Sequence, residues 1–89
     1  MIILTYISAF WDGSVEDVVL GAKMKREADR LLAQIGRANT MIVAVKAGAR
    51  AEGFVLGLET AGALRAGDAE SLYLAFESAF EQRLKILAS

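Results

Sequence analysis

Apolar side chains recur every three or four positions between residues 14 and 37. They are Leu20, Met24, Ala28, Leu31 and Ile35. This spacing places them along one face of a helix. Ser14 stands where an N-cap is expected, with Asp17 three residues later, and Arg37 lies where the negative end of the helix dipole favours a cation. The segment therefore predicts an amphipathic helix that begins near Ser14 and ends near Arg37.

The last segment of the chain has the same periodicity. Its apolar positions are Leu72, Phe76, Ala79, Phe80, Leu84 and Leu87. Asp68 can cap the start of a helix, and Arg83 and Lys85 lie near its end, where the dipole favours positive charge. A second amphipathic helix is predicted from Asp68 onward.

The segment between these two is open to two interpretations. The runs MIVAVK and FVLGL are rich in β-branched and other apolar residues and could form two buried strands. With MIILTYI as a first strand, the chain would then fold as βαββα. However, the segment also has a row of small residues at every fourth position, which are Ala49, Gly53, Gly57 and Ala61. This row and the charges at Lys46, Arg50, Glu52 and Glu59 favour a helix from about Thr40 to Leu64.

On a helix the row of small residues would form a groove that is nearly free of side chains. A glycine inside a helix costs about 0.8–1.0 kcal/mol relative to alanine, so Gly53 and Gly57 need compensation. Close approach of another backbone provides it through dispersion contacts. The approaching helix could belong to the same chain or to a second copy, and the sequence leaves both possibilities open.

The chain has 89 residues and no proline, so one domain covering residues 1–89 is expected and nothing forbids long helices. Breaks are expected at Asp12–Gly13, at residues 36–39 and at Ala66–Gly67. The favoured fold is all-α: an antiparallel bundle of three helices plus a short N-terminal helix, with α+β (βαββα) as the alternative.

The side chains on which most catalytic and metal sites depend are missing. The sequence contains no histidine and no cysteine, which removes the usual neutral-pH base, the thiolate ligands and the commonest metal ligand. Glu52 and Glu59 are seven residues apart, about 10 Å along a helix, which is too far to act on one bond. No glycine-rich phosphate-binding motif is present. We therefore expect no catalytic residue, no metal site and no cofactor, and a protein that is not an enzyme.

Charge is unevenly distributed along the chain. Residues 23–37 contain five basic and two acidic residues, although the whole chain has a net charge of −1. Two pairs of opposite charges lie four residues apart, Lys23 with Glu27 and Lys25 with Asp29. Lys23, Arg26 and Arg30 form a candidate basic face. Because the pI is about 5.3, nucleic-acid binding through this face is an alternative that is not favoured.

Hydrophobic residues make up 55% of the chain, which is high for a domain with so small an interior. We therefore expect association with a second copy or with another protein. Tyr6, Phe10 and Trp11 are a candidate partner surface, because aromatic residues are favoured anchors of interfaces. The stretch MIILTYISAFW is too short to span a membrane and has no preceding basic residue, so we expect no secretory signal and no membrane partner, and a cytoplasmic protein.

The segments ARAEGFVLGLETAGAL and ISAFWDGSVEDV together resemble small accessory proteins encoded in temperate phage and prophage genomes. The resemblance implies a binding protein that modulates or blocks a host factor, such as a nuclease, a defence complex or a cell-division component. It assigns no functional residue. The sequence thus leads us to expect a non-catalytic, homo-oligomeric interaction protein that inhibits or modulates a protein partner.

Overall fold

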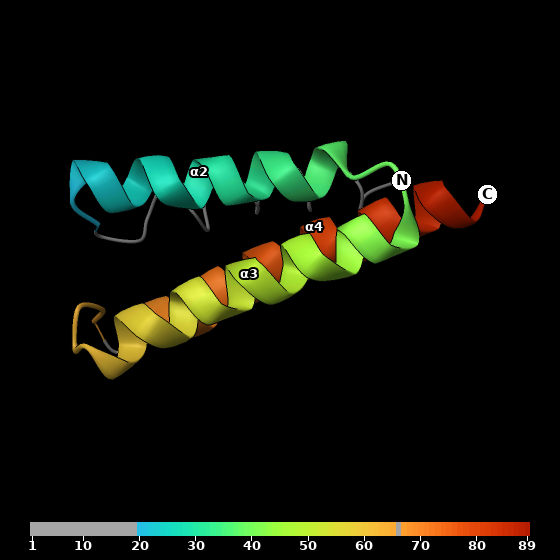
Figure 1. Ribbon diagram of the computed structural model, residues 1–89. Coiled ribbons are helices and arrows are strands. Elements are labelled where there is room, and N and C mark those ends of the chain that lie inside the picture. Colours follow the sequence, from blue (N-terminus) through green and yellow to red (C-terminus); the bar gives the residue numbers. More distant parts are fainter. Residues whose placement is uncertain (1–19, 66) are drawn as a thin grey trace, which may run out of the picture.

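The computed structural model describes residues 20–65 and 67–89, and every regular element in this part of the chain is an α-helix. The three helices are α2 (Ala22–Arg37), α3 (Met41–Thr60) and α4 (Asp68–Ala88), which Figure 1 shows in sequence colours. The prediction of a helix over the disputed middle segment is confirmed, and the two-strand alternative is wrong. The expected N-terminal helix lies outside the described residues.

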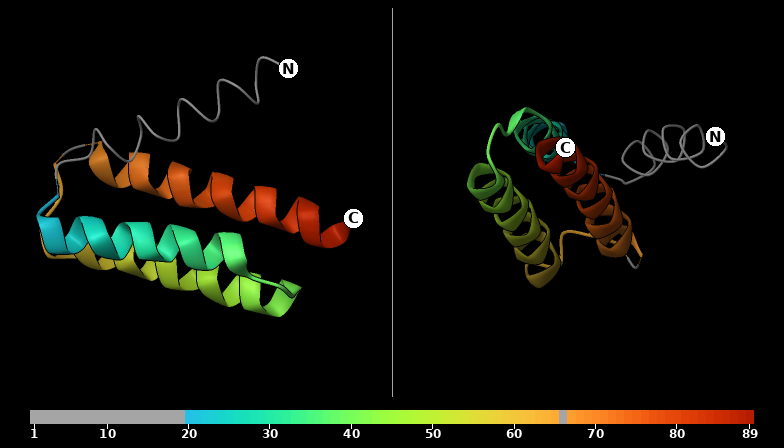
Figure 2. Two further views of the ribbon diagram at one scale, coloured as in Figure 1. Left: turned by 90° about the horizontal axis from the view of Figure 1, so that it is seen from above. Right: turned by 90° about the vertical axis from the view of Figure 1, so that its right-hand side faces the viewer.

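The three helices run up, down and up. α2 and α3 are joined by a short connection, and α3 turns back into α4 at the opposite end (Figure 1). Each of the three helices contacts the other two, and the views in Figure 2 show them lying alongside one another. The described residues therefore enclose one small core between the three helices.

α2 begins later than the sequence predicts. Gly21 is the N-cap, with extended backbone angles (φ −64°, ψ 159°), and it supplies no side-chain cap. The predicted start near Ser14 lies outside the described residues, but the helix does not run without a break from there, because the backbone at Gly21 is extended. Glycine is one of the residues that are favoured at the N-cap position. The predicted end at Arg37 is confirmed.

Both ends of α3 are set by local sequence. The Oγ1 atom of Thr40 accepts a hydrogen bond of 3.1 Å from the backbone N–H of Val43, which caps the first turn. At the other end Gly62 takes a positive φ of 70°, and Ala63 donates its backbone N–H to the Leu58 carbonyl at 2.9 Å. This glycine-dependent ending stops the helix at Thr60, before the predicted Leu64.

The start of α4 corrects a second predicted cap. Gly67, in a left-handed conformation with φ 88°, is the N-cap, and Asp68 is the first helical residue. The Asp68 carboxylate is buried and pairs with Arg65, whose Nε lies 2.8 Å from Oδ2. This pairing and hydrogen bond raise the pKa of the Arg65 guanidinium. Asp68 therefore fastens the α3–α4 turn to the helix instead of capping it.

Alanines, and not glycines, form the face of α3 that points into the core. Ala44, Ala47 and Ala51 are buried together with Val55 and Leu58. They meet the predicted apolar stripes of the other helices, of which Ala28, Leu31, Ile35, Leu72 and Phe76 are buried. The remaining members are only partly buried or, like Met24 at 37%, exposed. Small side chains on α3 thus let the larger side chains of α2 and α4 fill the core.

One close approach to a glycine does occur, at a position that the sequence analysis did not single out. A Cβ atom added at Gly48 would lie 3.2 Å from the Phe80 ring of α4. Gly48 therefore leaves space for this aromatic ring between α3 and α4.

Candidate interaction surface

The side of α3 that faces away from the core is apolar. We call it the outer face of α3 and define it by residues that share this side of the helix: Ile42, Val45, Ala49, Gly53, Leu56 and Gly57. All six are exposed, and the exposed fractions of Ile42, Val45 and Leu56 are 67%, 54% and 55%. Large apolar side chains that gather in this way on one helix are typical of an interaction surface.

The predicted row of small residues belongs mostly to this outer face. Ala49, Gly53 and Gly57 are exposed on it, and Ala61 is the exposed C-cap of α3. Nothing lies within 4 Å of a Cβ atom added at Gly53 or Gly57. Within residues 20–65 and 67–89, no helix packs against the row, so the interpretation as internal packing is not supported there. The interpretation as a groove for a second copy stays a prediction.

An apolar groove of about 580 Å³ lies beside the outer face, between α3 and α4. Its aromatic lining comes from Tyr73, Phe76 and Phe80 of α4. The charged side chains in its lining are both acidic, Glu52 from α3 and Glu77 from α4. We call this the acidic groove.

Tyr73 marks the end of this groove that is closer to Glu59. Burial raises the pKa of its hydroxyl above the ordinary value of 10.0. The negative charges of Glu59 and Glu52 raise it further, because a carboxylate nearby disfavours the ionised hydroxyl. Both effects favour the protonated hydroxyl. The surroundings of Tyr73 are therefore electrically negative.

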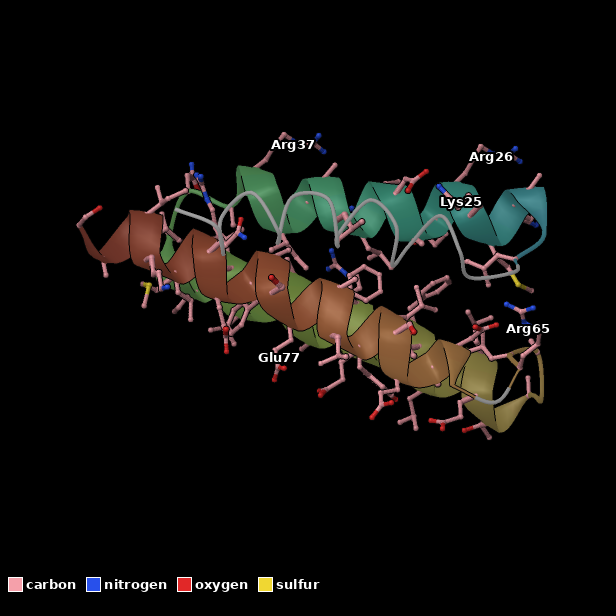
Figure 3. The ribbon with its side chains drawn as sticks, turned by 180° about the vertical axis from the view of Figure 1, so that it is seen from behind. Lys25, Arg26, Arg37, Arg65 and Glu77 are labelled. Carbon is pink, nitrogen blue, oxygen red and sulfur yellow. The ribbon has the colours of Figure 1, made fainter. Side chains whose placement is uncertain are left out.

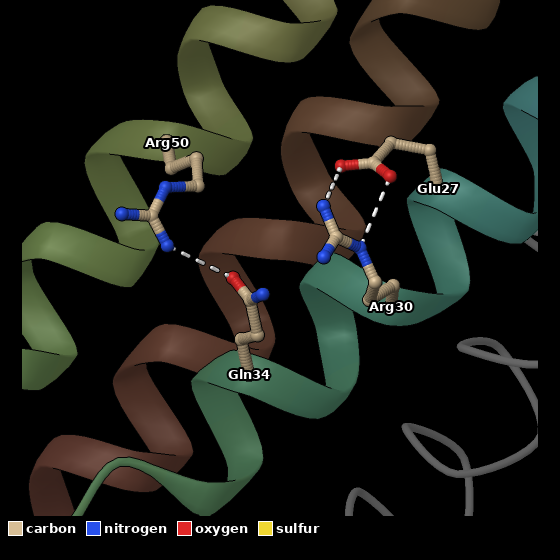
Figure 4. Close-up of polar contacts among 4 residues, drawn as sticks. All are labelled: Glu27, Arg30, Gln34 and Arg50. Carbon is tan, nitrogen blue, oxygen red and sulfur yellow. Dashed lines mark hydrogen bonds and ion pairs between the residues drawn. The ribbon is translucent and has the colours of Figure 1, made fainter.

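A second cleft, of about 320 Å³, lies on the other side of the outer face, between α2 and α3. The charged side chains in its lining are all basic: Arg37, Lys46 and Arg50. Arg50 donates a hydrogen bond of 3.2 Å to the Oε1 atom of Gln34 (Figure 4). Among the described residues no carboxylate forms an ion pair with these three cations. We call this the basic cleft.

The basic cleft could not be predicted from the sequence pattern, because its members lie on two helices. Arg37 was assigned to the end of the first predicted helix, and Lys46 and Arg50 only indicated that the middle segment is helical. The four-residue spacing of Lys46 and Arg50 could have indicated a shared side of a helix. Nothing in the sequence indicated that Arg37 lies beside them.

The predicted basic face on α2 is partly neutralised. Lys23, Arg26 and Arg30 are all exposed, but Arg30 forms a two-bond ion pair with Glu27, at 3.0 and 3.1 Å (Figure 4). This pairing raises the pKa of the Arg30 guanidinium. Glu27 therefore pairs with Arg30 and not with Lys23 as predicted, whereas the predicted pair of Lys25 with Asp29 is confirmed at 3.1 Å. Arg26 and Arg37 project away from the bundle on the outer side of α2 (Figure 3).

The candidate partner surface predicted from the sequence lies outside the described residues; it consists of Tyr6, Phe10 and Trp11. Lys85 lies in the last turn of α4 and Arg83 lies before it, where its Nε donates a hydrogen bond of 2.6 Å to the Ala38 carbonyl and so ties α4 to the end of α2. In the described part of the chain, no helix is long and apolar enough to cross a membrane, and no three acidic residues gather as metal ligands would.

Comparison of the whole chain with family models, with curated proteins and with solved structures finds no match.

Proposed function

We propose that this protein is a non-catalytic, homo-oligomeric interaction protein of the cytoplasm. Two copies associate through the outer face of α3, and the oligomer binds a different protein and modulates or inhibits it. Tyr6, Phe10 and Trp11 are the candidate residues for contact with that second protein. The resemblance to phage and prophage accessory proteins suggests that the second protein is a host factor.

The observation that carries this proposal is the exposed apolar outer face of α3. Ile42, Val45 and Leu56 are more than half exposed on one helix, and burying the exposed apolar part of these side chains favours association. Gly53 and Gly57 lower the helix propensity of α3 without any contact among the described residues that would compensate. A second backbone lying against them would supply the missing contacts.

Sedimentation velocity of the full chain over a wide range of concentrations tests the proposal. We expect a monomer at low concentration that converts to a dimer as the concentration rises. The double variant Ile42→Gln/Leu56→Gln should stay monomeric under the same conditions, because it makes the outer face polar. The matched control is Leu74→Gln/Ile86→Gln, which changes two exposed apolar residues of α4 and should leave the association unchanged.

A full chain that remains monomeric at high concentration would contradict the proposed oligomer. Loss of association in the α4 control, with retention in the α3 variant, would move the interface to α4. Circular dichroism of each variant checks that the helices are retained.

Nucleic-acid binding is a second candidate function, supported by the projection of Arg26 and Arg37 from the outer side of α2 (Figure 3). Lys23 adds a further exposed charge to this side. The variant Lys23→Ala/Arg26→Ala/Arg30→Ala should then weaken binding to duplex DNA and reduce its dependence on salt concentration. No binding of the unaltered chain at about 50 mM salt, where electrostatic contacts are strong, would exclude this function.

A further inference from the structure

The outer face of α3 lies between two regions of opposite charge. The acidic groove, with Glu52 and Glu77, borders it on the side of α4, and the basic cleft, with Lys46 and Arg50, borders it on the side of α2. Figure 3 shows Glu77 projecting from the bundle on the side opposite to Arg26 and Arg37 of α2.

The two charged regions also lie at the same height along α3. The acidic groove is lined by α3 residues from Val45 to Glu52, and the basic cleft by α3 residues from Val43 to Arg50. Arg50 and Glu52, on opposite sides of the outer face, differ in height by only about 3 Å, at about 1.5 Å per residue.

This layout distinguishes between the two ways in which the outer faces of two copies can meet with two-fold symmetry. If the α3 helices are parallel, with the two-fold axis running along them, the α2 side of one copy faces the α4 side of the other. The basic cleft then meets the acidic groove at the same height. If the helices are antiparallel, basic side faces basic side and acidic side faces acidic side. Opposite charges attract and like charges repel across an interface, so the parallel arrangement is favoured.

We propose that two copies of this chain pair through the outer faces of parallel α3 helices, with Arg50 of each copy facing Glu52 of the partner subunit. This inference rests on the proposed function, and it adds the direction of the helices and the ion pairs. Gly53 and Gly57 lie on the shared face, where the absence of side chains lets two backbones approach closely.

Disulfide cross-linking measures the direction of the helices. The sequence contains no cysteine, so a single introduced thiol reports one position. Ala49 and Thr60 are exposed and lie three helical turns apart along the same side of α3, separated by about 16 Å. In the parallel dimer, two chains of the Ala49→Cys variant form a disulfide with each other, and so do two chains of the Thr60→Cys variant. A mixture of the two variants forms no disulfide between Ala49→Cys and Thr60→Cys chains. Arg26→Cys, on the outer side of α2, is the control and should not cross-link.

An antiparallel dimer gives a different result. If Ala49 lies at the two-fold axis, the two copies of Thr60 are about 33 Å apart and only Ala49→Cys cross-links. If the axis lies midway between these positions, only the mixture cross-links. Either result overturns the parallel pairing while the proposed dimer stands. A full chain that stays monomeric overturns both.

Charge reversal tests the ion pairs. Arg50→Glu and Glu52→Arg should each weaken the dimer about tenfold, because each change turns two attractive contacts into repulsive ones. The double variant Arg50→Glu/Glu52→Arg should restore the dimer, since both partners are exchanged together. Lys23→Glu is a control of equal charge change away from the interface. Failure of the double variant to restore the dimer overturns the proposed pairs.

Alkylation of Ala49→Cys by iodoacetamide in dilute solution identifies a different occupant. An open outer face gives the rate of an exposed thiol in the monomer and a slower rate in the dimer. If residues 1–19 of the same chain cover this face, the thiol is already protected in the monomer, and the pairing of two copies through it is overturned.

Discussion

At the scale of single residues, the glycines of α3 differ in what surrounds them. Gly53 and Gly57 have open space where a Cβ atom would be, whereas a Cβ atom at Gly48 would meet Phe80 at 3.2 Å. All three lie inside the same helix, so the propensity gained on replacement by alanine is the same for each. The difference in free energy of unfolding between the alanine variants at these sites therefore reports the cost of the contact with Phe80.

We expect Gly53→Ala to stabilise the monomer by about 0.8–1.0 kcal/mol, the difference in helix propensity. Gly48→Ala should gain less, because the Phe80 ring must move to accept the new methyl group. Urea unfolding at a concentration low enough to keep the chain monomeric measures both free energies. An equal gain at both positions would show that the groove between α3 and α4 accommodates a methyl group without cost.

Tyr73 makes stability depend on pH in the alkaline range. Its pKa in the folded protein is raised above the ordinary value of 10.0, by burial first and by Glu59 and Glu52 next. The folded state therefore holds this proton more tightly than the unfolded state. The contribution to stability is fully present below the unfolded pKa and is lost as the pH rises through the folded pKa.

Two measurements check this pH dependence. In a Tyr6→Phe chain, Tyr73 is the remaining tyrosine, and its absorbance change should occur at a higher pH in the folded protein than in urea. Glu59→Gln should lower that pH, since it removes a negative charge. As the pH rises above about 10, the free energy of unfolding should fall less in the Tyr73→Phe variant than in the unaltered chain. An identical midpoint in folded and unfolded protein would contradict the assignment.

At the scale of the helix, α3 has apolar residues on two opposite sides, and only the alanine side faces the core. Ala51 has no exposed surface, whereas Ala49 is exposed two residues earlier. A larger side chain at a buried position forces its neighbours apart, and the same side chain at an exposed position extends into solvent.

The change from alanine to leucine at these two positions tests the direction in which α3 faces. Ala51→Leu should destabilise the monomer by about 1–3 kcal/mol through overpacking. Ala49→Leu should change the free energy of unfolding by no more than about 0.5 kcal/mol. Thermal unfolding of the dilute proteins provides the comparison. The opposite order would mean that the glycine side of α3 faces the core.

At the scale of the whole molecule, stability and association are linked. A chain of this length buries only about 60–65% of the surface that it exposes when unfolded, so its own core provides limited stability. Binding of a second copy to the folded state shifts the folding equilibrium by mass action. In the dimer that we propose, the apolar outer face of α3 would be the surface through which this shift acts.

We therefore expect Tm to rise with protein concentration. The Ile42→Gln/Leu56→Gln variant should have a Tm that does not depend on concentration, because it cannot pair. Differential scanning calorimetry at several concentrations measures this dependence. A constant Tm for the unaltered chain would argue against a dimer that is coupled to folding.

The sequence by itself determined where most helices lie and how several of them end. Periodic apolar positions predicted α2 and α4, and the four-residue spacing of small residues correctly favoured a helical middle segment. Arg37 was placed correctly because the dipole effect acts within one turn of the chain, and the start of the middle helix near Thr40 was also predicted correctly. The expected cap at Asp68 failed because the neighbouring Gly67 set the start of α4 instead, and α2 starts after Gly21, later than the sequence predicts.

Only the tertiary structure decided which side of α3 is buried. Both sides are apolar, so periodicity fixes the angle between them but not which one turns toward α2 and α4. The side of α3 that carries Ala44, Ala47 and Ala51 faces the core, because these small side chains let the larger side chains of the neighbouring helices fill it. The tertiary structure also brings the end of α2, at Arg37, to the cleft that Lys46 and Arg50 of α3 line, an arrangement that depends on how two helices cross and that no spacing along the chain encodes.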